Sequence, residues 1–510
     1  MNKNYFLGID IGTHESKGVL VNKNGNVLAE ASREHKLLIP LPGYAEHDPF
    51  QWWEDFIYLV KELVGKSGVS SKDIVSVACS AIAPTMLPLD TEGEPLRNAI
   101  LYGIDNRASK EIVELSEKIG KEKLLECTGT LLFSQSVGPK ILWFMKNEPH
   151  LFTRTKRIVT ATTYLVYKLT SRFVIDYYTA SAFNPMFNYK KMQWSNDLWE
   201  DAPIELLPDL EWTTSIAGGV TKKAAVETGL EEGTSVIVGT ADAAAEAVSS
   251  GVAEIGDLMI MYGTSAFFIE IIDRFIKSTS AWPAVYLQPG MYAITAGMST
   301  CGAIMAWFKE MLSGCSYEDL DKLAEKVYPG ANGLLALPYF SGERTPINNP
   351  NARGAIIGLS LFHRKDHLFR ALLEAIAYGI RDNIKNITKA GLPPKRVIAI
   401  GGGVKSGILL QIVSDVARIK QIVPKTRLGA CYGDAFLAAL AVGRYTRLLD
   451  VLNWIEWQTE TCPIEENSLL YDKYFKLYKS LYASTSEIVD RLVSLSQDDA
   501  KLKVLRRDVT

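Results

Sequence analysis

The first residues of the chain alternate between apolar runs and short turns that contain glycine. Residues 5–11 (YFLGIDI) predict a β-strand, a second strand is expected around residues 18–21, and a third begins at Val27. Gly12-Thr13 and Asn24-Gly25 separate these runs and have the composition of turns. The pattern therefore predicts a β-meander at the start of a domain.

Further along the chain, segments with helical periodicity alternate with short apolar runs. PFQWWEDFIYLVKELVG predicts a helix with a core-facing aromatic side, and DIVSVACS predicts a strand, a combination typical of a mixed α/β sheet covered by helices. After residue 256, DLMIMYGTSAFFIEII again places a strand, a Gly-Thr turn and a strand in succession. This echo predicts two related halves joined near residues 245–256, where AAAEAVSSGVAEIG is either a hinge or a helix.

The second half ends in a strand-turn-helix unit, RVIAIGGG followed by VKSGILLQIVSDVARI, and then in the small-residue helix GACYGDAFLAALAVG. Residues 446–510 are expected to form peripheral helices with a polar, frayed end at KLKVLRRDVT. No candidate chemistry lies in this tail.

Length and composition narrow the class of protein. The 510 residues are enough for two or three domains, so a cleft between domains is plausible. With 47% hydrophobic residues, 22% charged residues and a net charge of -3, nothing favours a nucleic-acid partner. The six cysteines form no CxxC pair, and neither a signal peptide nor an apolar run of membrane-spanning length occurs. We therefore expect buried free thiols and a cytoplasmic enzyme without membrane contact.

Two acids follow predicted strands beside Gly-Thr turns. In GIDIGTHESK, Asp10 ends an apolar strand, where an acid is costly unless a cation such as magnesium meets it, although a capping role is equally open. IVGTADAAAEA repeats the arrangement at Asp242, and MYGTSAF adds Gly263, Thr264 and Ser265. Recurrent Gly-Thr turns at strand ends indicate one polyphosphate held by several backbone segments.

Gly401, Gly402 and Gly403 lie between a strand and a helix. Their spacing to Gly407 does not match the dinucleotide fingerprint, and no acid stands at QIVPK, about 20 residues on. The glycines instead suit close approach of adenine or the α-phosphate to the backbone. No GxxxxGK[ST] sequence occurs, so an ATP enzyme of this sequence is not of the P-loop type.

Over residues 5–445, these motifs together resemble the FGGY carbohydrate kinases. The resemblance implies an α/β fold of two ribonuclease-H-like domains, as in the actin and hexokinase superfamily, with a cleft between them. The implied ranges are 1–247 for a sugar- and phosphate-binding domain, 248–445 for an ATP-binding domain and 446–510 for C-terminal helices. The implied cofactors are ATP and Mg²⁺.

The resemblance also assigns roles to residues. It implies that Asp242 is the general base, that Asp10 and Asp242 hold magnesium, and that Ser80, Asp105, Arg107 and Asp242 bind the acceptor. A structural salt bridge is the alternative for Asp105 and Arg107. The implied ATP-binding residues are Gly12, Thr13, Lys17, Gly263, Thr264, Ser265, Gly401, Gly402, Gly403, Lys405 and Ser406.

The acceptor is less well indicated than the phosphate site. LPYFSGERTPINNPNARG most resembles the xylulokinases, which implies a pentulose such as D-xylulose. The chain departs from their pattern at Ile82, Ala83 and Pro84, at Gly103 in a tryptophan position, and at Ala182 in an arginine position. Glycerol, gluconate or a tetritol are therefore alternative acceptors, and an actin-like nucleotide switch is an alternative class. By analogy with similar kinases, a homodimer is a further expectation.

Overall fold

The computed structural model describes residues 4–312, 314–426 and 428–507, with side chains up to residue 496. The chain divides into two compact units. The first comprises Met1–Ile255, Ile271–Ile294 and Thr426–Glu456, and the second Gly256–Glu270, Thr295–Lys425 and Trp457–Thr510. Both units therefore contain segments that are far apart in sequence. The predicted domain boundaries at residues 247 and 445 remain a prediction. The division into compact units assigns residues 426–456 to the first unit.

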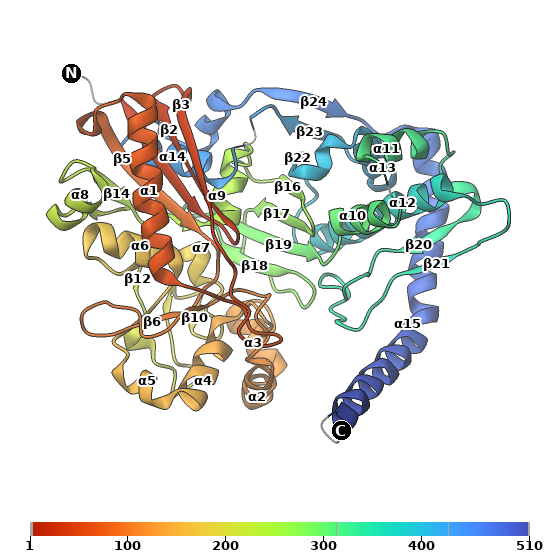
Figure 1. Cartoon of the computed structure of the whole chain (residues 1–510), viewed down its shortest axis with the longest axis horizontal. Helices are drawn as coiled ribbons and strands as arrows, with labels where there is room; N and C mark the ends of the chain where they lie inside the picture. The colour runs from red at the N-terminus through yellow and green to blue at the C-terminus, as the bar shows by residue number, and fades with distance from the viewer. Residues whose placement is uncertain (1–3, 313, 427, 508–510) are drawn as a thin grey trace. The chain divides into compact units, whose positions relative to one another are not determined.

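A seven-stranded sheet forms the centre of the first unit, with the order β13-β14-β5-β1-β2-β3 and β15 beside β5 (Figure 1). The predicted meander is confirmed, because β1 pairs antiparallel with β2, and β2 with β3. β1 also pairs parallel with β5. The strands are β1 Tyr5–Ile11, β2 Glu15–Asn22, β3 Val27–Glu34, β5 Ile74–Ala81, β13 Ile216–Gly219, β14 Ser235–Ile237 and β15 Thr240–Ala241.

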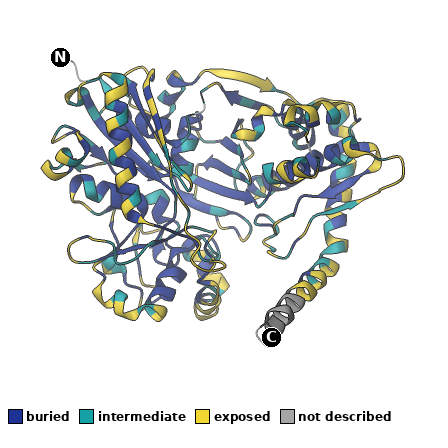
Figure 2. Cartoon of the chain, in the orientation of Figure 1, coloured by how far each residue is buried: buried dark blue, intermediate teal, exposed yellow. Residues whose placement is uncertain are grey.

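Helices cover both faces of this sheet. A Cβ on Gly18 would meet Leu63 of helix α1 (Pro49–Ser67), and a Cβ on Gly8 would lie 1.9 Å from the Cys431 carbonyl oxygen of helix α14 (Ala430–Ala441). In the pairing of β1 with β2, Gly8 is opposite Val19 and Gly18 is opposite Ile9. Because successive residues of a strand point to opposite sides of the sheet, the two glycines lie on opposite sides. The backbone contact at Gly8 explains why residues 426–456 belong to the first unit. Figure 2 shows the strands between these helices as buried.

Some of the remaining elements of the first unit build a second hydrophobic core around Phe144 and Phe183. The helices of the first unit other than α1 and α14 are α2 Ser109–Ile119, α3 Lys121–Thr128, α4 Val137–Asn147, α5 Pro149–Arg154, α6 Ala161–Thr170, α7 Tyr177–Ala180, α8 Lys222–Thr228 and α9 Asp242–Ser249. Its paired short strands are β4 Glu46–His47 with β7 Ala99–Ile100, β6 Leu87–Leu89 with β8 Arg157–Val159, β9 Val174–Asp176 with β12 Asp209–Glu211, and β10 Phe187–Asn188 with β11 Gln193–Trp194.

The second unit is centred on a sheet of order β18-β19-β17-β16-β22-β23-β24. β16 pairs antiparallel with β17 and parallel with β22, just as β1 pairs with β2 and β5, so the internal repeat is confirmed. The strands of this sheet are β16 Asp257–Tyr262, β17 Ala266–Ile272, β18 Trp282–Val285, β19 Tyr292–Met298, β22 Arg396–Ile400, β23 Gln421–Pro424 and β24 Trp457–Thr461. Of these, β18 and the adjoining ends of β17 and β19 fall within the segment Ile271–Ile294 of the first unit. β20 Leu335–Leu337 and β21 Ala355–Ile357 form a separate pair. The helices are α10 Gly302–Met311, α11 Tyr317–Glu325, α12 Lys365–Ala390, α13 Gly407–Ala417 and α15 Glu465–Arg507.

Several sequence expectations are refined. AAAEAVSS is the helix α9, so the helical alternative holds there. For residues 446–510 we expected several peripheral helices. The structure has a short 3₁₀ helix, Leu448–Trp454, then strand β24 and one long helix. Residues 501–507 of the expected frayed end are helical, whereas 508–510 lie outside the described residues. All six cysteines are unpaired; only three are buried, and Cys462 is exposed. Within the described ranges, no helix combines the length and apolarity that crossing a membrane requires.

Candidate functional site

Strand register places three predicted site residues side by side in the first unit. In the parallel strands β1, β5 and β15, Asp10 pairs with Ser80, and Ser80 with Thr240. Asp242 follows Thr240 by two residues and begins helix α9. Parallel strands bring their carboxyl ends to one edge of a sheet, where ligands of α/β proteins bind. Both acids therefore lie at the same edge.

Asp10 lies among other acids. The Ser80 hydroxyl is 3.1 Å from Asp10 Oδ1 and 2.6 Å from Asp434 Oδ2, and its single proton serves one carboxyl group at a time. Burial raises the pKa of Asp10 well above its ordinary value, and the charges of Asp242 and Glu246 raise it further. The site thus concentrates carboxyl groups whose ionised forms a cation would stabilise.

Asp434 and Glu246 were missed in the sequence. Asp434 is fully buried on α14, and burial raises its pKa well above the ordinary value. Glu246 lies one helical turn after Asp242, and burial raises its pKa as well. A signal was present, because Asp434 is an acid within the apolar helix GACYGDAFLAA. Its nearness to Asp10 was not readable, because more than four hundred residues separate them.

One oxygen of the Asp242 carboxyl group is held by a backbone hydrogen bond. The Ala243 backbone N–H donates to its Oδ1 at 2.7 Å, which leaves Oδ2 for another partner. Burial raises the pKa of Asp242 to about 7; the Ala243 hydrogen bond opposes this shift, and the Glu246 charge adds to it. A carboxyl group with such a pKa can exchange a proton near neutral pH.

Buried Asp176, from the DYYTAS segment, holds the Gly-Thr turn before Asp242. Its Oδ2 accepts hydrogen bonds from Thr240 Oγ1 at 2.6 Å and from Thr213 Oγ1 at 3.1 Å. Gly239 has a φ of +73°, and a Cβ there would lie 2.2 Å from the Cys79 carbonyl oxygen. The turn is therefore pressed against the end of β5, and only glycine fits its tip.

The first Gly-Thr turn is fixed by different partners. Gly12 N–H donates to the Glu15 carbonyl at 3.1 Å, and Thr13 Oγ1 lies 3.2 Å from the Tyr102 hydroxyl. Lys17 is opposite Asp10 in the β1–β2 pairing and forms an ion pair with Glu15 at 3.0 Å. Thr13 is thus joined to the loop that follows β7, which carries the predicted acceptor residues.

Asp105 and Arg107 form a buried salt bridge. Arg107 Nη2 donates to Asp105 Oδ2 at 2.8 Å, its Nη1 lies 2.8 Å from Glu46 Oε1, and both side chains of the pair have 0% exposure. The Asp105 carboxylate also accepts from Ala45 N–H at 2.7 Å. The structure shows the salt-bridge alternative, and contact of this pair with the acceptor stays a prediction.

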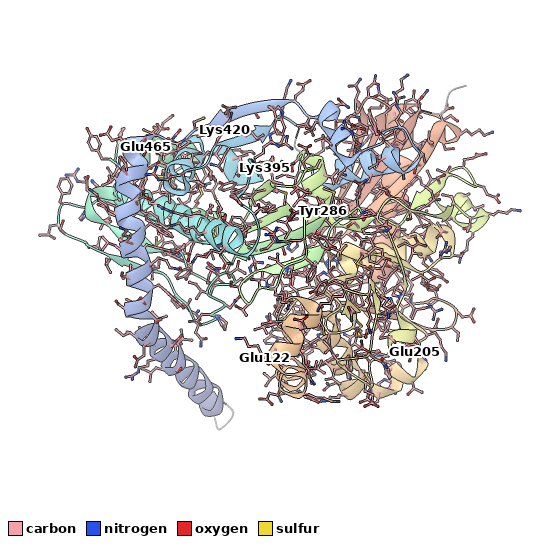
Figure 3. The ribbon with its side chains drawn as sticks, turned by 180° about the vertical axis from the view of Figure 1, so that it is seen from behind. Glu122, Glu205, Tyr286, Lys395, Lys420 and Glu465 are labelled. Atoms are coloured by element: carbon pink, nitrogen blue, oxygen red, sulfur yellow. The ribbon has the colours of Figure 1, made fainter. Side chains whose placement is uncertain are left out.

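Gly12, Thr13 and Lys17 apart, the predicted nucleotide residues lie in the second unit, at the carboxyl ends of β16 and β22. Gly263, Thr264 and Ser265 form the β16–β17 turn, whose carbonyls accept the first backbone N–H groups of α10. Gly401 has a φ of +90°, and a Cβ there would lie 2.7 Å from the Tyr262 carbonyl oxygen. Lys395 and Lys420, labelled in Figure 3, precede β22 and β23 at the opposite ends of these strands.

Ser406 and Lys405 differ in their surroundings. The Ser406 hydroxyl caps helix α13 by accepting from Leu409 N–H at 3.3 Å, and it is buried. Lys405 is exposed. Gly402 has no neighbouring atom within 4 Å of a Cβ position, so its backbone has room for a ligand. The backbone at Gly402 is thus the more accessible part of this segment.

Three comparisons relate the chain to known proteins. Models of the N- and C-terminal domains of the FGGY family of carbohydrate kinases match residues 5–249 and 258–442. A xylulose kinase of Bacillus subtilis (strain 168) is 31% identical over 501 residues, covering 97% of this chain and 100% of that protein. A gluconokinase of the same strain is 26% identical over 492 residues, covering 94% and 95%. The crystal structure of xylulose kinase from Rhodospirillum rubrum superimposes with a TM-score of 0.89 at 30% identity, covering 95% and 99%.

Proposed function

Because this chain belongs to the FGGY family of carbohydrate kinases and is therefore an ATP-dependent enzyme, we propose that it phosphorylates a hydroxyl of a pentulose such as xylulose. Full-length similarity to xylulose kinases supports the acceptor class. The observation that carries the mechanism is the register that aligns Asp10, Ser80 and Thr240 and places Asp242 two residues beyond. Phosphoryl transfer depends on positioning and on charge stabilisation, and this register brings a candidate proton acceptor and Gly-Thr turns to one sheet edge.

Asp242 accepts the proton of the attacking hydroxyl in this proposal. One of its oxygens is occupied by the Ala243 N–H, so Oδ2 receives the proton. The bond between the acceptor oxygen and the γ-phosphorus of ATP forms while the bond from that phosphorus to the β–γ bridging oxygen breaks, and ADP leaves. Such general-base assistance typically contributes about 10²–10⁴-fold to the rate. Burial, which raises the pKa of Asp242 to about 7, makes the carboxylate basic enough for this role.

Magnesium fits the donor set of the first unit. Among the described residues, no group of three or more His, Cys, Asp or Glu side chains is arranged to hold a metal ion. Magnesium, however, is usually bound by one or two carboxylates together with phosphates and water, which is what Asp10 and Asp242 provide. When bound, it would neutralise charge on the phosphates. The backbone of Gly12 and Thr13 and the Lys17 side chain would bind the same phosphates.

The second unit holds the rest of the nucleotide in this proposal. Gly263, Thr264 and Ser265 would contact the terminal phosphates, and the backbone of Gly401–Gly403, with Lys405 and Ser406, would receive the adenosine part and the α-phosphate. The free cysteines support a reducing, cytoplasmic location. The predicted homodimer is checked by light scattering of the purified chain.

A coupled ADP-release screen tests the function. At fixed magnesium and ATP, the acceptors are xylulose, ribulose, glycerol, gluconate and erythritol. We expect turnover with a pentulose at least tenfold above that with the other acceptors. Rapid turnover of gluconate alone would refute the pentulose assignment in favour of the second candidate, which the gluconokinase similarity favours. No acceptor-dependent ADP release would refute the kinase itself.

A further inference from the structure

A buried histidine lies behind the first Gly-Thr turn. His35 directly follows strand β3, and its side chain has 2% exposure. The Nε2 atom of His35 lies 2.9 Å from the Gly12 carbonyl oxygen. Because a carbonyl oxygen only accepts, Nε2 carries a proton and donates this hydrogen bond. The His35 backbone N–H donates to the His14 carbonyl oxygen at 2.9 Å, so one residue from outside the turn holds two of its carbonyl groups.

The ring of His35 is fixed by its neighbours. Its Nδ1 lies 2.8 Å from Oδ2 of Asp55, a buried residue of helix α1. The same Oδ2 accepts a hydrogen bond from Ser16 Oγ at 2.7 Å, and Oδ1 accepts one from Gln51 Nε2 at 2.6 Å. The His47 ring packs edge-on against that of His35, with centroids 5.1 Å apart. Asp55 therefore orients the imidazole with Nε2 toward the turn.

The position of Asp55 indicates a role beyond packing. It lies on the same side of α1 as the buried residues Trp52 and Leu59, about one helical turn from each. A buried carboxyl group costs stability unless it is paired, and an apolar residue in such a position is often at least as stabilising. The Arg33 guanidinium, 3.4 Å from Oδ1, supplies one cation. His35 connects the same carboxyl group to the Gly-Thr turn.

The hydrogen bond at Gly12 fixes the peptide unit between Gly12 and Thr13. This peptide is trans, so its C=O and N–H groups point in opposite directions. Because the carbonyl points to the buried His35, the Thr13 N–H points away from it. Among the described residues, this N–H donates no hydrogen bond, so it is available to a phosphate oxygen. Glycine restricts backbone rotation least, and His35 therefore supplies the restraint that Gly12 does not.

We propose that His35 is a positioning residue for nucleotide binding, whose ring, oriented by Asp55, holds the Gly12 carbonyl so that the Thr13 N–H faces a phosphate of ATP. This inference rests on the proposed function, because it assumes that the first Gly-Thr turn contacts the β- and γ-phosphates. Without the hydrogen bond, the Gly12–Thr13 peptide unit rotates more freely in the unbound protein, and ordering it on binding lowers the affinity. One hydrogen bond of this kind corresponds to about 2- to 12-fold in the dissociation constant.

Two substitutions at His35 separate its two side-chain contacts. The amide nitrogen of an asparagine lies near the position of Nδ1, and that of a glutamine lies near the position of Nε2. His35→Gln therefore keeps a donor for Gly12, whereas His35→Asn keeps one only for Asp55. We expect the dissociation constant of Mg-ATP, measured by calorimetry, to rise about 4- to 12-fold in His35→Asn and less than about twofold in His35→Gln. The dissociation constant of AMP, which has neither the β- nor the γ-phosphate, should change less than about twofold in both variants.

His150→Asn and His150→Gln, at an exposed position of the same unit, are the matched controls and should leave both dissociation constants unchanged. The melting temperatures of the two His35 variants should agree within about 2 °C, which excludes a difference in folding as the cause. Equal Mg-ATP constants in His35→Asn and His35→Gln, or equal losses for Mg-ATP and AMP, would overturn the inference and leave the proposed function standing.

The wild type provides a test that decides where a variant is unstable. With ¹⁵N-labelled histidine, NMR shows whether Nε2 of His35, identified by its contact with the His47 ring, carries a proton. A protonated Nε2 is expected, and an unprotonated one would overturn the inference, because only a donor can bind the Gly12 carbonyl. The proposed function fails separately if the wild type binds Mg-ATP but releases no ADP with any acceptor, and the dissociation constants then still decide the role of His35. A wild type that does not bind Mg-ATP refutes both.

Discussion

Glu270, in β17 of the second unit, is a carboxyl group without a partner. Its side chain has 0% exposure, and among the described residues neither of its oxygens has a hydrogen-bond partner. Burial raises the pKa of Glu270 to about 8. Because the pKa in the folded state lies above the unfolded value of about 4.3, the native state binds this proton more tightly. This carboxyl group should therefore contribute most to the stability of the second unit when the pH is below the unfolded-state pKa. Its contribution should fall as the pH rises toward 8.

The magnitude follows from linkage. Between the two pKa values, the free energy of unfolding falls by about 1.4 kcal/mol for each pH unit. From pH 5.5 to pH 8 it therefore falls by about 3 kcal/mol, because Glu270 is already partly ionised in the folded state near pH 8. Glu270→Gln removes the titration and keeps the shape of the side chain. The stability difference between Glu270→Gln and the wild type should grow in favour of the variant by about 3 kcal/mol over this range.

Urea unfolding followed by tryptophan fluorescence measures the difference, and the second unit contributes Trp307 and Trp457 to the signal. Glu325→Gln, at an exposed position in the same unit, is the matched control and should stay within about 0.5 kcal/mol of wild type at both pH values. A difference between Glu270→Gln and wild type that is the same at pH 5.5 and pH 8 would refute the reasoning.

Three further predictions concern the first unit. Lys140→Met removes the donor of two loop carbonyls, those of Leu101 and Tyr102, and should cost about 1–3 kcal/mol of stability, measured by urea unfolding. It should also raise the KM for the acceptor, and an unchanged KM would contradict this prediction. Asp434→Ala removes a partner of the Ser80 hydroxyl and should lower kcat about tenfold, whereas Asp434→Asn should stay within about threefold; equal losses would argue against the hydrogen bond as the cause. Because the pKa of Asp242 is raised to about 7, kcat/KM for the acceptor should fall about tenfold per pH unit below that value, and a flat profile from pH 5.5 to 8 would contradict this.

The elements that could be predicted from the sequence are local ones. The meander and the Gly-Thr turns could be predicted from consecutive residues, because a strand, a turn with glycine and a second strand follow each other directly in the sequence. Asp10 and Asp242 stood out for the same reason, since each acid follows an apolar strand. The strand register then explains why these local signals meet at one sheet edge.

The features that escaped prediction depend on long-range packing. Asp434 reaches Ser80 because α14 packs on β1 through the close contact at Gly8, which no local pattern encodes. Gln135 and Gly103 are 32 positions apart in the sequence and meet only because α4 is held against the loop after β7. A missing Cβ is visible in the sequence as a glycine, but the side chain that fills its space is not.

The replacement Asp242→Asn tests the central claim most directly, because it removes the proton acceptor and keeps the shape of the side chain. With xylulose, ATP and magnesium, acceptor-dependent ADP release should fall at least about 100-fold, while the dissociation constant for ATP, measured by calorimetry, changes less than about threefold. Asp209→Asn, at an exposed position of the same unit, should keep normal turnover. Turnover of Asp242→Asn within about tenfold of wild type would contradict the assignment of Asp242 as the catalytic base.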